Sequence, residues 1–108
     1  MTDVRPGETP EMRRLRRRID ALDRRIVALL DERTRLGLQV GRAKLDGGRR
    51  AVRDTERERE VLLRVAAAND GPLPQADLLA LYRRLIAATR RLEAAAARRD
   101  GSRPRPAG

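Results

Sequence analysis

The first half of the chain carries an apolar stripe with the spacing of a long α-helix. Apolar residues recur there at alternating steps of three and four, interrupted only at position 33: Met12, Leu15, Ile19, Leu22, Ile26, Leu29, Leu36, Val40 and Ala43. Thr9, Pro10 and Glu11 supply an N-cap, a proline at the first helical position and a first-turn acid. The paired glycines at 47 and 48 then break the pattern. The spacing predicts one helix from 11 to about 46 with a heptad seam.

This helix is too long for a small compact domain. At ~1.5 Å per residue it extends about 50 Å, whereas a compact domain of about 100 residues has a radius of gyration of ~13 Å. We therefore expect the helix to pack partly against a second chain.

Two shorter helices follow. Asp54 or Thr55 caps the second, which stops at residues 69–72, and Pro74 opens the third. No stretch alternates with the period of a strand, so the fold class is all-α with three helices. Residues 10–100 form the single domain, and the Pro- and Gly-rich segments 1–9 and 101–108 are expected to be disordered ends.

The amino-acid composition excludes several kinds of catalytic and structural site. The 108 residues include no Cys and no His, which excludes disulfides, thiolates, a zinc site and a histidine base. Tyr82 is the only aromatic residue, and Ser102 is the only serine. The sequence has neither an apolar run of membrane-spanning length nor the apolar stretch of a signal peptide, so we expect a cytoplasmic protein without membrane contact.

The formal net charge of +10 is consistent with a polyanionic partner, a small acidic ligand or a solvated basic surface. Of the 26 cationic residues, only Lys44 is a lysine. Its compact ammonium differs from a planar guanidinium in reach and geometry.

Two cations lie on the apolar face of the first helix. Arg33 occupies a heptad position that should be apolar, and the same face continues to Lys44, three turns on. Gly37 and Gly41 lie between them and lack side chains, which indicates a cavity for an anion. The alternative is that Arg33 reaches a partner carboxylate while the glycines allow close helix packing.

Polar residues also extend the apolar faces of the other helices. Asp54, Arg57 and Glu58 precede the apolar stripe of the second helix, although Thr55 and Glu58 would also form a capping box. Thr89 and Glu93 lie one turn apart on the third helix. Lys44 would provide the cation that a buried Glu93 needs, unless Glu93 pairs with a surface arginine.

Arg16 lies at the edge of the seam, within an arginine run that is otherwise typical of a solvated helix face. It precedes Arg33 by 17 residues, about 25 Å along a straight helix. The two arginines of one chain therefore cannot share a small ligand. Only Arg16 of an antiparallel second chain could join a site at Arg33.

The segments LRRRIDALDRRIVALLDERTRLGLQVGRAK and VRDTERERE closely resemble the all-helical chorismate mutases, a similarity that covers about residues 12–96. The resemblance implies an intertwined homodimeric helical bundle with two equivalent sites and a small dianionic substrate. It implies that Arg16 is contributed by the partner, that Arg33 and Arg57 bind carboxylates, and that Lys44 contacts the ether oxygen. Asp54 and Glu58 resemble a pair that orients the substrate hydroxyl. Thr89 lies where the family often has Ser, and Glu93 lies where many members have Gln.

The reaction of this family, chorismate to prephenate, is a unimolecular pericyclic rearrangement that needs no cofactor, metal or nucleophile. The resemblance therefore accounts for the missing His and Cys, and it makes Lys44, Glu93 and Arg33 the expected catalytic residues. Two departures from the family pattern are a longer loop at residues 46–53, with Ala51 in place of a common proline, and Glu93 itself.

Other functions stay open. An isochorismate pyruvate lyase or a 4-amino-4-deoxychorismate mutase would use nearly the same cations. A related alternative is a poorly active mutase that is activated by a partner enzyme of the shikimate pathway. A basic nucleic-acid-binding module fits less well, because stacking aromatics are missing and acids are interspersed along every helix. A purely structural dimerisation module would leave Arg33 in the seam without an anion.

Overall fold

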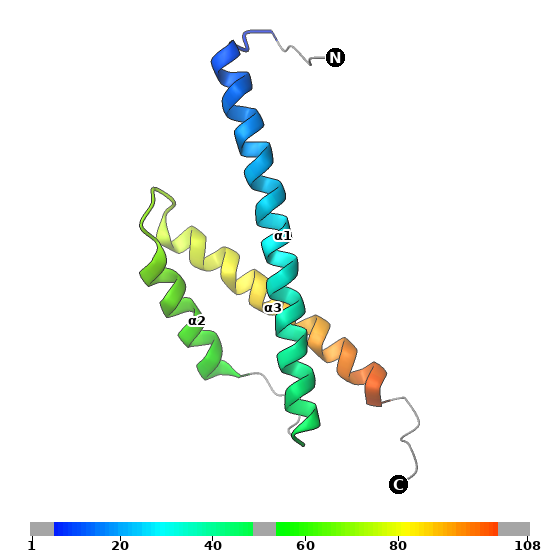
Figure 1. Ribbon diagram of the computed structural model, residues 1–108. Coiled ribbons are helices and arrows are strands. Elements are labelled where there is room, and N and C mark those ends of the chain that lie inside the picture. The colour runs from blue at the N-terminus through cyan, green and yellow to red at the C-terminus, as the bar shows by residue number, and fades with distance from the viewer. Residues whose placement is uncertain (1–5, 49–53, 102–108) are drawn as a thin grey trace. The chain divides into compact units, whose positions relative to one another are not determined.

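The computed structural model describes residues 6–48 and 54–101, and they form three α-helices (Figure 1). They are α1 (Pro10–Asp46), α2 (Thr55–Ala68) and α3 (Gln75–Gly101). No strand occurs within these ranges, which confirms the predicted all-α class. Most of the predicted disordered ends, and Ala51 with its loop, lie outside the described residues.

The ends of α1 follow from local chemistry. The Thr9 hydroxyl accepts a hydrogen bond from the Met12 backbone N–H at 3.1 Å, which satisfies one of the free donors of the first turn. At the other end, Gly48 adopts a φ of +79°, a left-handed conformation that suits glycine after a helix. The predicted boundaries of 11 and about 46 agree with the structure to within one residue.

Helices α2 and α3 pack against each other and are joined by a short connection. Asp54 is the N-cap of α2, and Asn69 ends the helix in an extended conformation. The Asn69 side-chain amide donates to the Leu73 carbonyl at 3.0 Å, which fixes the turn before Pro74 and α3. Both predicted breaks between helices therefore occur where the sequence places them.

The chain divides into two compact units, Met1–Arg35 and Leu36–Gly108. The first holds most of α1, and the second holds the last turns of α1 with α2 and α3. Among the described helices, none has an apolar stretch long enough to cross a membrane.

The apolar seam of α1 is left uncovered in the single chain. Ile19 is 54% exposed, Ile26 is 51% exposed, and no residue of α1 is buried. Among the described residues, no hydrophobic side chain is fully buried anywhere, and Thr89 is the one buried residue, at 7% exposed. The described residues of a single copy thus form no closed hydrophobic core.

Candidate functional site

Helix α3 approaches the last turns of α1 through two glycines. A Cβ atom added to Gly37 would lie 2.7 Å from the Thr89 Cγ2. The Thr89 hydroxyl donates to the Leu85 carbonyl at 3.0 Å, so the side chain is held with its methyl group towards Gly37. This contact explains why Thr89 is buried, because no side chain at position 37 holds the helices apart.

One turn further along both helices, Gly41 faces Glu93. A Cβ on Gly41 would lie 3.2 Å from Glu93 Cγ and 3.6 Å from its Oε2. The side chains of α3 therefore occupy the space beside both glycines. Of the two interpretations of Gly37 and Gly41, the structure supports close helix packing rather than an open cavity between them.

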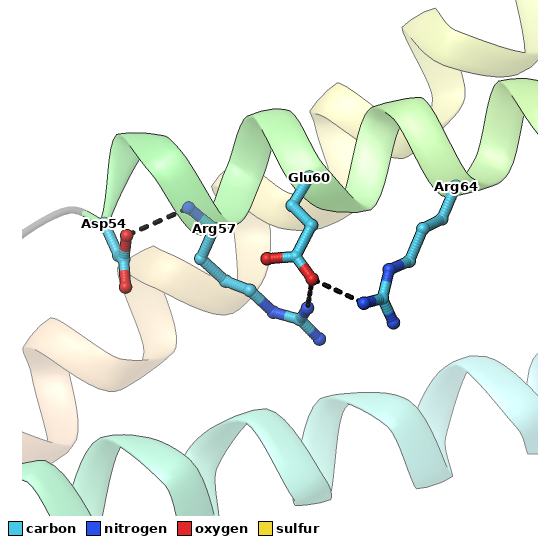
Figure 2. A network of polar contacts seen from close by, with 4 residues as sticks. All are labelled: Asp54, Arg57, Glu60 and Arg64. Atoms are coloured by element: carbon cyan, nitrogen blue, oxygen red, sulfur yellow. Dashed lines mark hydrogen bonds and ion pairs between the residues drawn. The ribbon is translucent and has the colours of Figure 1, made fainter.

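Asp54 links the start of α2 to the end of α1. Its Oδ1 accepts a hydrogen bond from the Arg57 backbone N–H at 2.9 Å (Figure 2), and its Oδ2 lies 3.9 Å from Lys44 Nζ. The second distance is an ion pair too long for a hydrogen bond. Lys44 was expected to neutralise Glu93. Within the ranges that the structure describes, it pairs with Asp54 instead, and Glu93 has no cation within ion-pair distance.

Glu58 is bound by an arginine that no pattern in the sequence distinguishes from the others. The Arg90 guanidinium on α3 donates from Nη1 to Glu58 Oε1 at 2.7 Å, and the side chains are 36% and 17% exposed respectively. The two residues are 32 positions apart, so the pair depends on how α2 and α3 pack. The capping box suggested by Thr55 and Glu58 is wrong, because Asp54 caps the helix and Glu58 points to α3.

Arg57 lies on the exposed side of α2. Its guanidinium donates to Glu60 at 3.2 Å, and the same oxygen of Glu60 accepts from Arg64 at 2.6 Å (Figure 2). Since the Arg57 side chain is 57% exposed, this pairing is weak and exchangeable in water. Arg57 would have to exchange Glu60 for the carboxylate of an incoming anion.

Arg16 and Arg33 belong to the first unit, and their place in a site stays a prediction. Arg16 donates to Glu8 at 2.8 Å; Arg16 is 48% exposed and the Glu8 side chain only 7%. Arg33 is half-buried on α1. The second unit, by contrast, holds the other six predicted residues. Five of them make contacts between helices: Lys44 with Asp54, Glu58 with Arg90, and Thr89 and Glu93 with the two glycines of α1.

Such an arrangement is suited to binding and orienting an anion. Cations provide charge-assisted hydrogen bonds to carboxylates, and acids at the start of α2 can accept a hydrogen bond from a hydroxyl. Glu93 can act as an acceptor when ionised or as a donor when protonated.

Comparison with known proteins places these residues in a family context. The family model for chorismate mutase type II matches residues 15–94. A solved structure of chorismate mutase (form II) from Thermus thermophilus is 34% identical, with a TM-score of 0.72, covering 77% of this chain and 93% of that one. Form I from the same organism is 33% identical, with a TM-score of 0.69, covering 73% of this chain and 98% of that one.

Longer relatives match as well. A bifunctional chorismate mutase/prephenate dehydratase of Stutzerimonas stutzeri is 34% identical over 91 residues, which are 81% of this chain and 25% of the relative. The corresponding protein of Escherichia coli (strain K12) is 51% identical over 51 residues, 47% of this chain and 13% of the relative. The chain thus spans about a quarter or less of the length of these bifunctional relatives.

Proposed function

Because the chain belongs to the chorismate mutase type II family, we propose that it converts chorismate to prephenate in the cytoplasm, as a homodimer with two equivalent sites. The observation that carries this proposal is that Lys44, Asp54, Glu58, Thr89 and Glu93 all make contacts between helices within the second unit. These residues come from three separate segments of the sequence, and all lie within the matched residues 15–94.

The rearrangement breaks an ether C–O bond and forms a C–C bond within one molecule, without a covalent enzyme intermediate. The protein must hold the substrate in its folded conformer and stabilise the negative charge that develops on the ether oxygen. A ~10⁶-fold acceleration corresponds to about 8 kcal/mol, which a few charge-assisted contacts and conformational restraint can supply.

Each predicted residue has a role in this proposal. Arg33 and Arg57 bind the carboxylates together with Arg16 of the second chain, and Lys44 donates to the ether oxygen. Asp54 and Glu58 accept from the hydroxyl, while Thr89 and Glu93 line the site from α3. No cofactor or metal takes part.

The exposed seam of α1 supports the homodimer. A stripe of large apolar side chains that stays in water is unfavourable, and a second copy of the same helix offers a matching apolar surface. An antiparallel arrangement would also bring Arg16 of one chain to Arg33 of the other.

The test is a chorismate assay on the wild type and on Arg33→Ala, with the dimer mass measured on the same samples. Arg35→Ala, two positions along α1 and exposed, is the matched control. We expect Arg33→Ala to lose turnover and keep the dimer, while Arg35→Ala keeps both. Loss of the dimer in Arg33→Ala would instead make Arg33 a packing residue, and a wild type that does not convert chorismate would contradict the proposed function.

A further inference from the structure

The two acids proposed to bind the substrate hydroxyl each have a cation from a different helix. Asp54 lies 3.9 Å from Lys44 on α1, and Glu58 is hydrogen-bonded to Arg90 on α3 at 2.7 Å. The formal charges of these four side chains sum to zero. An acid pair without these cations would present two negative charges to whatever binds there.

Because their charges are balanced, the two acids should bind a substrate hydroxyl better than a substrate amine at the same position. A neutral hydroxyl can donate a hydrogen bond to a carboxylate whether or not a cation lies behind it. An amine at the same substrate position is protonated at neutral pH, and an ammonium gains most from a carboxylate whose charge is not already compensated. A cation bound to that carboxylate also repels the ammonium directly.

Arg90 is the cation with the closer contact. Its guanidinium lies at hydrogen-bond distance from Glu58, and the Glu58 side chain is only 17% exposed, so solvent screens the pair less than it screens the surface pairs of α2. Unlike the pair of Glu60 with Arg64, it does not arise from local helical spacing. It fixes Glu58 from the opposite helix.

We propose that Arg90 is a positioning and specificity-determining residue, which holds Glu58 and compensates its charge so that the site accepts a substrate hydroxyl and rejects an ammonium in its place. This inference rests on the proposed function, because it takes Glu58 as the hydroxyl contact. It favours chorismate over 4-amino-4-deoxychorismate as the substrate.

The experiment measures kcat/KM of the intact protein at neutral pH for chorismate and for 4-amino-4-deoxychorismate. The ratio is the value for chorismate divided by the value for 4-amino-4-deoxychorismate. The variants are Arg90→Gln, Arg90→Lys and Glu58→Gln. Arg91→Gln is the matched control, since Arg91 is the next residue on α3 and is exposed. Dimer mass and melting temperature are recorded for each variant.

We expect Arg90→Gln to lower the ratio about tenfold, which corresponds to a change of about 1.4 kcal/mol in the difference between the two activation free energies. Arg90→Lys keeps the positive charge and should keep most of the ratio, and Arg91→Gln should leave it unchanged. Glu58→Gln should raise the ratio, because Arg90 then remains without its carboxylate and repels the ammonium more strongly. This opposite sign tests the proposal even where Arg90→Gln does not fold.

An unchanged ratio in Arg90→Gln, an equal fall in Arg90→Lys, or a fall in Glu58→Gln would overturn the role of Arg90 while leaving the mutase activity intact. Absence of chorismate turnover by the wild type would instead overturn the proposed function, and this inference with it.

Discussion

Gly37 and Thr89 pack so closely that a methyl group on Gly37 would lie 2.7 Å from Thr89 Cγ2. Thr89 cannot easily turn away, because it is β-branched and its hydroxyl is bonded to the Leu85 carbonyl. Alanine at position 37 gains about 1 kcal/mol of helix propensity, but overpacking costs about 1–3 kcal/mol. We predict that Gly37→Ala lowers the melting temperature of the protein.

The same substitution should have the opposite effect in a Thr89→Ser background. Serine lacks Cγ2, so the clash disappears and only the gain in helix propensity remains. Gly37→Ala with Thr89→Ser should therefore melt above Thr89→Ser alone. Thermal unfolding of the four proteins, followed by circular dichroism, measures both differences. If Gly37→Ala changes the melting temperature equally in the two backgrounds, the contact with Thr89 Cγ2 is not what makes a side chain at position 37 unfavourable.

The three helices were predictable because their signals are local. The start of α1 depends on Thr9 and Pro10, its end on paired glycines, and the start of α2 on Asp54, and all act within a few residues. The role of Gly37 and Gly41 was not decided by sequence. Spacing places both on one face of α1, but whether that face is open or filled depends on the position of α3.

Glu93 gives a prediction about activity. A glutamine side chain has an N–H group that can donate a hydrogen bond to the ether oxygen, whereas a carboxylate has only acceptor oxygens. We therefore expect Glu93→Gln to have a higher kcat for chorismate than the wild type. The measurement is kcat of the two proteins at neutral pH.

Glu56→Gln provides the control, because Glu56 is an exposed acid in the first turn of α2. It should keep the wild-type kcat. An equal kcat for the wild type and Glu93→Gln would remove Glu93 from the mechanism.

Glu8 gives a prediction about substrate binding. It accepts a hydrogen bond from Arg16 at 2.8 Å, so a substrate carboxylate must compete with Glu8 for the same guanidinium. Glu8→Gln removes the competing charge and should lower KM several-fold while kcat changes little. Glu11→Gln is the matched control, since Glu11 pairs with Arg14 at a similar distance of 2.7 Å. A KM unaltered by Glu8→Gln would mean that Glu8 does not oppose substrate binding.

The candidate site was only partly accessible from sequence, for a physical reason. Asp54 and Glu58 stand out because they extend an apolar stripe, and Lys44 because it is the one lysine. Arg90 has no such signal, since it is one of many arginines and its partner lies 32 positions away. Its role emerges only when the packing of α2 and α3 is known. The position of the start of α2 beside the end of α1 determines, in the same way, that Asp54, and not Glu93, pairs with Lys44.

The α1 seam gives the prediction on which the dimer depends. Ile26 lies in the seam and is 51% exposed in the single chain, whereas Ala28 lies about 200° away around the helix. In a dimer that covers the seam, burying such a side chain contributes about 1.5–3 kcal/mol, and an aspartate there would place a charge in an apolar interface. Ile26→Asp should therefore dissociate the dimer, and Ala28→Asp should not.

Dissociation should also unfold the chain, because no hydrophobic side chain among the described residues is buried within one copy. We expect Ile26→Asp to lose helical circular dichroism together with its dimer mass in sedimentation equilibrium, in a concentration-dependent manner. Ala28→Asp should retain both signals. A folded, monomeric wild type, or an Ile26→Asp variant that remains a dimer, would show that the seam is not the surface that holds two chains together, and Arg16 would then have no route to the site of a partner.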